Sequence, residues 1–299
     1  MSVTDISSGS EASSSGRSRG RSRRGPRRLL GRGAAALGAT ALLGATVMTG
    51  SASAIVNGED ATQHYPFMAT VPIKEYGAQC GATLIDPQWV LTAAHCVNPE
   101  LATLTGKIRV GSDHRTTGGS VRNIDRIVTA PGYVQDMTGT THNKNDLALI
   151  RLDRPVSQKP IRIAAKAGPV GTPTRILGYG TVVEAPTLED AKFPDRLQQL
   201  DTRRGAASEC APGWAGKTRL CTVSPKPKAM ACNGDSGGPQ LQRAKNGRWE
   251  LIGATSGPGS LREGCGTGPG LYSNVPAFKD WIHKTIHESA HKAAHKSAK

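Results

Sequence analysis

The chain has 299 residues, of which 37% are hydrophobic, and its formal net charge is +15. This length and this apolar content allow a substantial buried core, so they exclude a coreless polypeptide and indicate a soluble globular protein. The sequence contains no Cys-x-x-Cys pair, which argues against a zinc ribbon or a thioredoxin-like site.

Residues 1–54 differ from the rest of the chain and predict an export signal. A Ser-, Gly- and Arg-rich arm precedes the apolar run "AAALGATALLGATVMTG", and an A-x-A cleavage site ends at Ala54. The pair Arg27 and Arg28 leaves both Sec and Tat export open. The position of the arm before the apolar run argues against nucleic-acid binding. The run itself is too weakly apolar to form a stable membrane anchor. Without this leader the chain remains basic, at about +9.

From Ile55 onward, short β-branched runs such as "KIRVGS", "DLALIRL" and "TRILGYGTVV" alternate with turn residues. This pattern indicates an all-β sandwich or barrel. Residues 155–173 are rich in Pro and Gly and predict a linker between two β subdomains. Helical spacing is clear only near the end of the chain, where it predicts an amphipathic helix carrying Val275, Phe278, Trp281, Ile282 and Ile286.

Six cysteines follow the leader, and an even number in an exported chain indicates disulfides in an oxidising compartment. Their spacing does not choose among the fifteen pairings that six cysteines allow. The six are Cys80, Cys96, Cys210, Cys221, Cys232 and Cys265.

Three short motifs hold the residue types of a nucleophilic serine site. "TAAHC" contains His95, "NDLALIRL" contains Asp146 and "MACNGDSGGP" contains Ser236. Such a site needs a hydroxyl, an imidazole that accepts its proton, and a carboxylate that orients the imidazole. Any one of these residues alone would be read as an ordinary surface, core or turn residue.

Together the three motifs resemble the chymotrypsin/trypsin family of serine proteases, in the manner of a secreted bacterial member. The resemblance runs from "IVNGEDATQHYPFMATV" at Ile55 to "LYSNVPAFKDWIHKTI". It implies two six-stranded antiparallel β-barrels with a C-terminal α-helix. The implied protease domain is 55–282, with barrels at about 55–165 and 166–282. It also implies a secreted endopeptidase that works through an acyl-enzyme.

The resemblance assigns roles to individual residues. Ser236 is the expected nucleophile, His95 the general base and acid, and Asp146 the orienting carboxylate. The backbone N–H groups of Gly234 and Ser236 form the expected oxyanion hole. An ion pair between Asp235 and a free α-amino group of Ile55 would order that turn.

Two further expectations follow from the resemblance. Because the A-x-A site ends directly before Ile55, signal peptidase itself would create the activating N-terminus. The implied disulfides join Cys80 to Cys96, Cys210 to Cys221, and Cys232 to Cys265.

Met230 occupies the position where trypsin-like members carry an aspartate at the base of the primary pocket. We therefore expect an apolar residue before the scissile bond. Glu263 at the rim offers an alternative source of preference for basic residues. Pro258 lacks the N–H that would pair with an extended substrate. The expected pocket residues are Met230, Ser256, Gly257, Pro258 and Gly270.

We expect no cofactor, and no calcium at the loop 111–123, which lacks glutamates. Polypeptide substrates and protein inhibitors are the expected partners, and a monomer is the expected state. The basic tail 283–299 reads either as a solvated cationic end or as a zinc- or copper-binding row. Its histidines are His283, His287, His291 and His295.

Two other functions compete with proteolysis: a catalytically silent relative that acts as a binding protein, and a basic protein that binds polyanions. The first would be expected to have lost His95, Ser236 or Gly234, and all three are present. Replacement of Ser236 by alanine separates the second from a protease.

Overall fold

The computed structural model describes residues 55–136, 142–185, 187, 189–261 and 264–297. For residues 290–297 it describes the backbone only. The expected export signal, residues 1–54, lies outside the described residues. Within the described ranges, no helix combines the length and the apolar character needed to cross a membrane.

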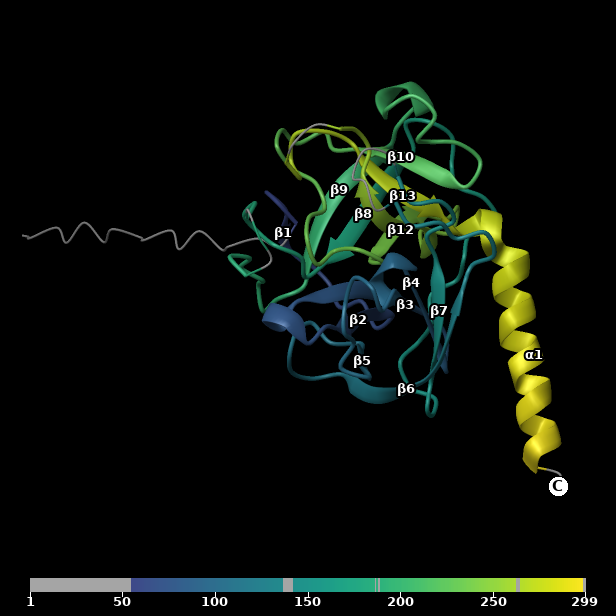
Figure 1. Ribbon diagram of the computed structural model, residues 1–299. Coiled ribbons are helices and arrows are strands. Elements are labelled where there is room, and N and C mark those ends of the chain that lie inside the picture. The colour runs from purple at the N-terminus through teal and green to yellow at the C-terminus, as the bar shows by residue number, and fades with distance from the viewer. Residues whose placement is uncertain (1–54, 137–141, 186, 188, 262–263, 298–299) are drawn as a thin grey trace, which may run out of the picture. The chain divides into compact units, whose positions relative to one another are not determined.

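The first barrel consists of six antiparallel strands that close in the order β2-β3-β4-β7-β6-β5 (Figure 1). Apolar residues fill its interior because strand residues alternate in direction, and Leu84, Leu91 and Leu149 are fully buried. The strands are β2 Met68–Pro72, β3 Gln79–Asp86, β4 Trp89–Thr92, β5 Lys107–Val110, β6 Ser120–Thr129 and β7 Ala148–Leu152.

The second barrel also closes with six strands, because β8 pairs with both β9 and β11. A short strand, β1 Glu59–Asp60, adds to β9 from outside the ring. The two-barrel fold expected from the sequence is therefore confirmed. The six strands are β8 Pro173–Gly178, β9 Gln198–Arg204, β10 Arg219–Val223, β11 Pro239–Arg243, β12 Trp249–Pro258 and β13 Gly270–Asn274.

The segment expected to be a linker, 155–173, packs against both barrels. Ile161 donates its N–H to the carbonyl of Leu84 in the first barrel, and Ala164 donates to Leu251 in the second. The Tyr179 hydroxyl adds a further link, since it donates to the carbonyl of Ser112 at 2.6 Å. These hydrogen bonds fix the barrels side by side, so residues from both contribute to one site.

The chain ends in helix α1, Lys279–Ser297, which follows a short 3-10 helix with Pro276 in its first turn. Ile282 is buried, and Arg126 of β6 donates to the Ser289 hydroxyl, so the helix lies against the first barrel (Figure 1). The segment 283–297 continues this helix without a break. The 3-10 helices are η1 Glu75–Gly77, η2 His95–Val97, η3 Ala207–Glu209 and η4 Val275–Phe278.

Candidate active site

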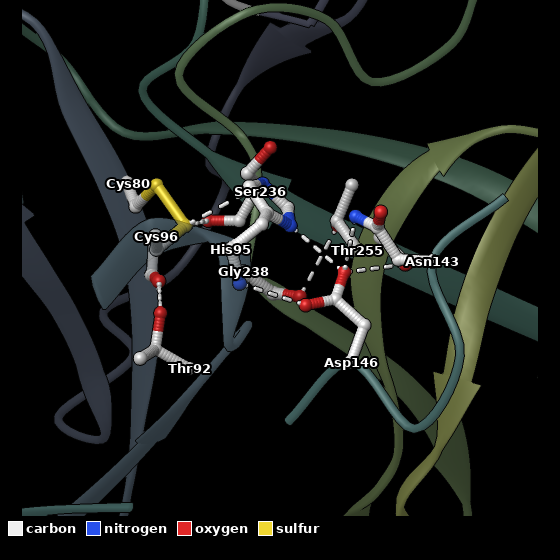
Figure 2. The surroundings of a disulfide bond; sticks show 11 residues. Cys80, Thr92, His95, Cys96, Asn143, Asp146, Ser236, Gly238 and Thr255 are labelled. Atoms are coloured by element: carbon white, nitrogen blue, oxygen red, sulfur yellow. Dashed lines mark hydrogen bonds and ion pairs between the residues drawn. A yellow bond between two sulfur atoms is a disulfide. The ribbon is translucent and has the colours of Figure 1, made fainter. Parts of the chain in front are cut away.

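His95 begins the short helix η2, three residues after the buried strand β4 ends at Thr92. A disulfide between Cys80 and Cys96 attaches this turn to β3. The His95 Nδ1 atom lies 2.8 Å from Asp146 Oδ2, and the His95 backbone N–H donates to Asp146 Oδ1 at 2.9 Å (Figure 2). These two contacts orient the imidazole with its Nε2 atom available for proton transfer.

Asp146 is 1% exposed and lies just before β7. Besides the two His95 contacts, its carboxylate accepts from the Ser256 hydroxyl at 2.6 Å and from Asn143 Nδ2 at 3.3 Å. Burial alone would raise the pKa of Asp146, but the charge and hydrogen bonds of His95 and the Ser256 hydroxyl outweigh it. The pKa therefore falls below its usual value, and the buried carboxylate stays ionised.

The same pair shifts the pKa of His95 in the opposite direction. Burial lowers the pKa of the imidazole, while the charge of Asp146 and its hydrogen bond raise it by more, so the net shift is upward. An imidazole in this setting is better able to hold a proton taken from a neighbouring hydroxyl.

Ser236 lies in the turn before β11, and its carbonyl accepts from the Gly81 N–H at 2.7 Å. The Cys96 sulfur lies 3.6 Å from this carbonyl and 3.7 Å from His95 Nε2, so the serine and the histidine share one neighbour (Figure 2). Within the described part of the chain, Ser236 Oγ makes no hydrogen bond to the imidazole. Such a contact requires rotation of the serine side chain, which is a fast motion.

The turn around Ser236 depends on the backbone conformation of Gly234. Gly234 has a φ of 95°, a conformation that favours glycine. Among the described residues, the N–H groups of Gly234 and Ser236 have no acceptor, while the neighbouring Gly237 N–H donates to Thr255. A Cβ at Gly234 would lie 2.8 Å from the Phe193 ring, a contact that no sequence signal indicates.

Asp235 is 1% exposed, and its carboxylate lies beside Gly178 and Gly180 in the second barrel. Its carboxylate accepts from the N–H groups of Gly180 at 2.8 Å and Cys232 at 2.9 Å. Burial raises the pKa of Asp235 to about 7, although these two hydrogen bonds act to lower it. Ile55 is fully buried in a cluster of the same barrel, and Val56 bridges to Met230.

A cavity of about 320 Å³ lies beside Ser236. Four of the residues that the resemblance assigns to the primary pocket, Met230, Gly257, Pro258 and Gly270, are among those that line it. Ser256 does not line the cavity, because its hydroxyl is bound to Asp146. The expected rim residue Glu263 lies outside the described residues.

Met230 and Glu184 bring an apolar and an acidic side chain to the lining of this cavity. Met230 is buried, and its sulfur lies 3.0 Å from the position that a Cβ at Gly270 would occupy, so the thioether lies against the pocket wall. Glu184 also lines the cavity and accepts from the Cys265 N–H at 2.9 Å. The sequence reasoning missed Glu184, because it lies far along the chain from every family motif.

The disulfides pair Cys80 with Cys96, Cys210 with Cys221, and Cys232 with Cys265, as expected from the resemblance. In the described chain, the one cluster of three metal-ligand atoms is that of Cys80, His95 and Cys96. Its two sulfurs are joined to each other, so they are not thiolates and the cluster offers no metal ligand set.

Comparison with known proteins places this geometry in a family. The Trypsin family model matches residues 55–282. The chain belongs to the trypsin family of serine proteases. This trypsin-family chain is 32% identical over 243 residues to a trypsin from Sarcophaga bullata, covering 77% of this chain and 88% of that protein.

Two other relatives agree with this assignment. Chymotrypsin-like elastase family member 3B from Macaca mulatta is 30% identical, over 78% of this chain and 94% of its own. The solved structure of mouse brain neuropsin, described as a serine protease, superposes with a TM-score of 0.65 at 26% identity, covering 78% of this chain and all of its own. The trypsin-family chain is accordingly a peptide-bond hydrolase.

Substitution of Gly178 by alanine tests whether the position of Asp235 controls the site. A Cβ there would lie 1.8 Å from Asp235 Oδ1, so the carboxylate must move and the adjoining turn with it. We expect kcat/KM to fall by about 10²-fold or more, the size of effect seen when an oxyanion donor is lost. Gly216→Ala is the matched control, because a Cβ at Gly216 has nothing within 4 Å. Equal activity of the two variants would contradict the argument.

Proposed function

We propose that this protein is a secreted serine endopeptidase in which Ser236, His95 and Asp146 form the catalytic triad. The observation that supports this most is the buried Asp146 held against His95, beside a serine whose N–H group, like that of Gly234, has no acceptor among the described residues. Polypeptides are the substrates in this proposal, with protein inhibitors as further partners. The protein acts as a monomer once leader 1–54 has been removed.

The proposed reaction follows from these groups. Ser236 Oγ attacks the scissile carbonyl while His95 Nε2 takes its proton, and the resulting oxyanion accepts from the Gly234 and Ser236 amides. His95 then protonates the leaving amine, which departs and leaves an acyl-enzyme. Water, deprotonated by the same imidazole, attacks the ester carbonyl. The bond to Ser236 Oγ then breaks, the imidazolium returns its proton to Oγ, and the acid is released. Asp146 stabilises the imidazolium through both halves of the cycle.

Replacement of Ser236 by alanine tests catalysis directly. We expect kcat to fall by about 10⁴-fold or more, because the nucleophile is lost while binding groups remain. Labelling by a serine-directed phosphonylating or sulfonylating reagent should disappear at the same time. Ser157→Ala, at an exposed serine, is the matched control and should behave as the parent protein. A Ser236→Ala variant that retains hydrolysis would exclude the proposed mechanism, and unchanged biological effect without hydrolysis would favour a binding protein.

The proposal includes an ion pair between Asp235 and the α-amino group of Ile55. A buried carboxylate without a cation is costly, and the raised pKa of Asp235 reflects that cost. In the uncleaved chain Ile55 has a φ of 63°, a strained conformation for a β-branched residue that costs about 1–3 kcal/mol. Cleavage after Ala54 removes this restriction, since an N-terminal residue has no φ. Both effects favour a chain that starts at Ile55.

A chain that begins at Ile55 can be compared with one that retains Ala54, both carrying Ser236→Ala to prevent self-digestion. In the longer chain, the pKa of Asp235 is about 7 when folded and 3.8 when unfolded. Its folded state therefore holds the extra proton, and its free energy of unfolding should fall by up to roughly 4 kcal/mol as the pH rises from 4 to 7.

The chain that starts at Ile55 should lack this decline, because its ammonium group stabilises the ionised carboxylate. Urea unfolding at pH 4, 5.5 and 7 measures the difference. Parallel curves for the two chains would eliminate the ion pair. Sequencing of the natural N-terminus supplies the complementary result, since a start upstream of Ile55 requires a second processing enzyme.

The proposed specificity is for an apolar residue before the scissile bond. Met230 lines the cavity with a thioether, which offers no countercharge to a guanidinium. Among the described residues, Glu184 is an acidic residue that lines the cavity. It supports the alternative preference for basic residues. Pro258 offers no N–H to an extended substrate, so pairing with β12 is weaker there.

A peptide-library profile of Glu184→Gln separates the two specificities. If Met230 determines the preference, the parent protein cleaves after apolar residues and Glu184→Gln changes kcat/KM by less than about threefold, since exposed charges contribute little. Glu189→Gln, at an exposed acid of the same loop, is the control. Cleavage of the parent after Arg or Lys, lost selectively in Glu184→Gln, would establish the alternative.

A further inference from the structure

Helix α1 carries a row of histidines that the proposed chemistry does not use. His283, His287, His291 and His295 recur at four-residue intervals. The backbone from Lys279 to Ser297 is one helix, so all four positions belong to the same helix. Residues four apart in a helix are neighbours on its surface, which makes each successive pair a candidate chelate.

The helix is held in place at the first of these pairs. Ile282 is buried and Ile286 packs against the hydrophobic core, while the Ser289 hydroxyl accepts from Arg126. His283 and His287 are both exposed. Packing therefore stabilises the helical turn between them, and both imidazoles remain accessible from solvent.

The two imidazoles are close to each other and lack other partners. Their ring centroids lie 6.4 Å apart, with the ring planes at 89°. Within the described residues neither ring has a hydrogen bond or an ion pair, and Glu288 is paired with Lys284 at 3.8 Å. Zinc–nitrogen bonds of about 2.0–2.1 Å would require only side-chain rotation to bring one nitrogen of each ring to a shared ion.

We propose that His283 and His287 together bind a divalent transition-metal ion such as Zn²⁺. Imidazole nitrogen suits zinc, copper and nickel, whereas magnesium and calcium prefer oxygen ligands. Two protein ligands leave positions on the ion for water or for a group from another molecule. Positions 291 and 295 repeat the spacing farther along the helix. This site is independent of the proposed proteolytic function, since no catalytic residue takes part in it.

Isothermal titration of the metal-free, leader-free protein with Zn²⁺ at neutral pH tests the site. Ser236→Ala is used throughout, so that hydrolysis plays no part in the result. The double variant His283→Ala/His287→Ala should bind one ion fewer, or bind zinc about tenfold more weakly or worse, since even outer-sphere partners of a metal contribute that much. Alanine favours helix, and circular dichroism verifies that α1 persists.

The matched control is His64→Ala/His114→Ala, which removes two exposed histidines that lie against Asp113 and Asp195. This control should titrate as the parent protein does. A parent protein that releases no heat with Zn²⁺, or that gives the same heat with Mg²⁺, would overturn the proposal. So would binding that survives in His283→Ala/His287→Ala but disappears in His291→Ala/His295→Ala, because the ion would then lie elsewhere.

Discussion

The burial of the Asp235 carboxylate is the constraint that shapes the active-site turn. The carboxylate lies where a Cβ at Gly178 or Gly180 would stand, so both positions must be glycine. Its bonds to the Gly180 and Cys232 amides tie the segment before Ser236 to the second barrel. These contacts hold the backbone, and among the described residues the carboxylate has no cationic partner. The turn is therefore built around a buried carboxyl group, and the ion pair proposed with the α-amino group of Ile55 would neutralise its charge.

A second buried acidic residue, Asp146, links the two barrels through the hydrogen bonds that it accepts. It precedes β7 of the first barrel, yet it accepts from Ser256 on β12 of the second. The Ser273 hydroxyl on β13 donates to its backbone carbonyl at 2.8 Å. Any relative movement of the barrels would break these hydrogen bonds and expose an unpaired charge to an apolar interior. The geometry of His95 thus depends on the barrel-to-barrel contact as much as on its own loop.

The features that could be predicted from the sequence are those determined by neighbouring residues. Strand runs and the spacing around Ile282 are local patterns, and the strands and the helix were found where they indicated. The contacts of Asn143 with Asp146, Phe193 with Gly234 and Glu184 with the cavity depend on how loops fold over one another. No periodicity or motif encodes those approaches. The disulfide pairing likewise came from the resemblance, since spacing alone left it open.

Helix α1 packs against the core on one side and faces solvent on the other. Ile282 on its buried side and Phe278 of the preceding η4 belong to the core, and the hydrogen bond from Arg126 to Ser289 adds a second contact that holds the helix in place. The imidazoles of His283 and His287 are exposed and so are free of any packing requirement. The helix that contributes to the core of the protease fold thus also presents side chains to the solvent. A metal ion at His283 and His287 would leave the proposed triad unchanged, because neither residue contacts His95, Asp146 or Ser236 among the described residues.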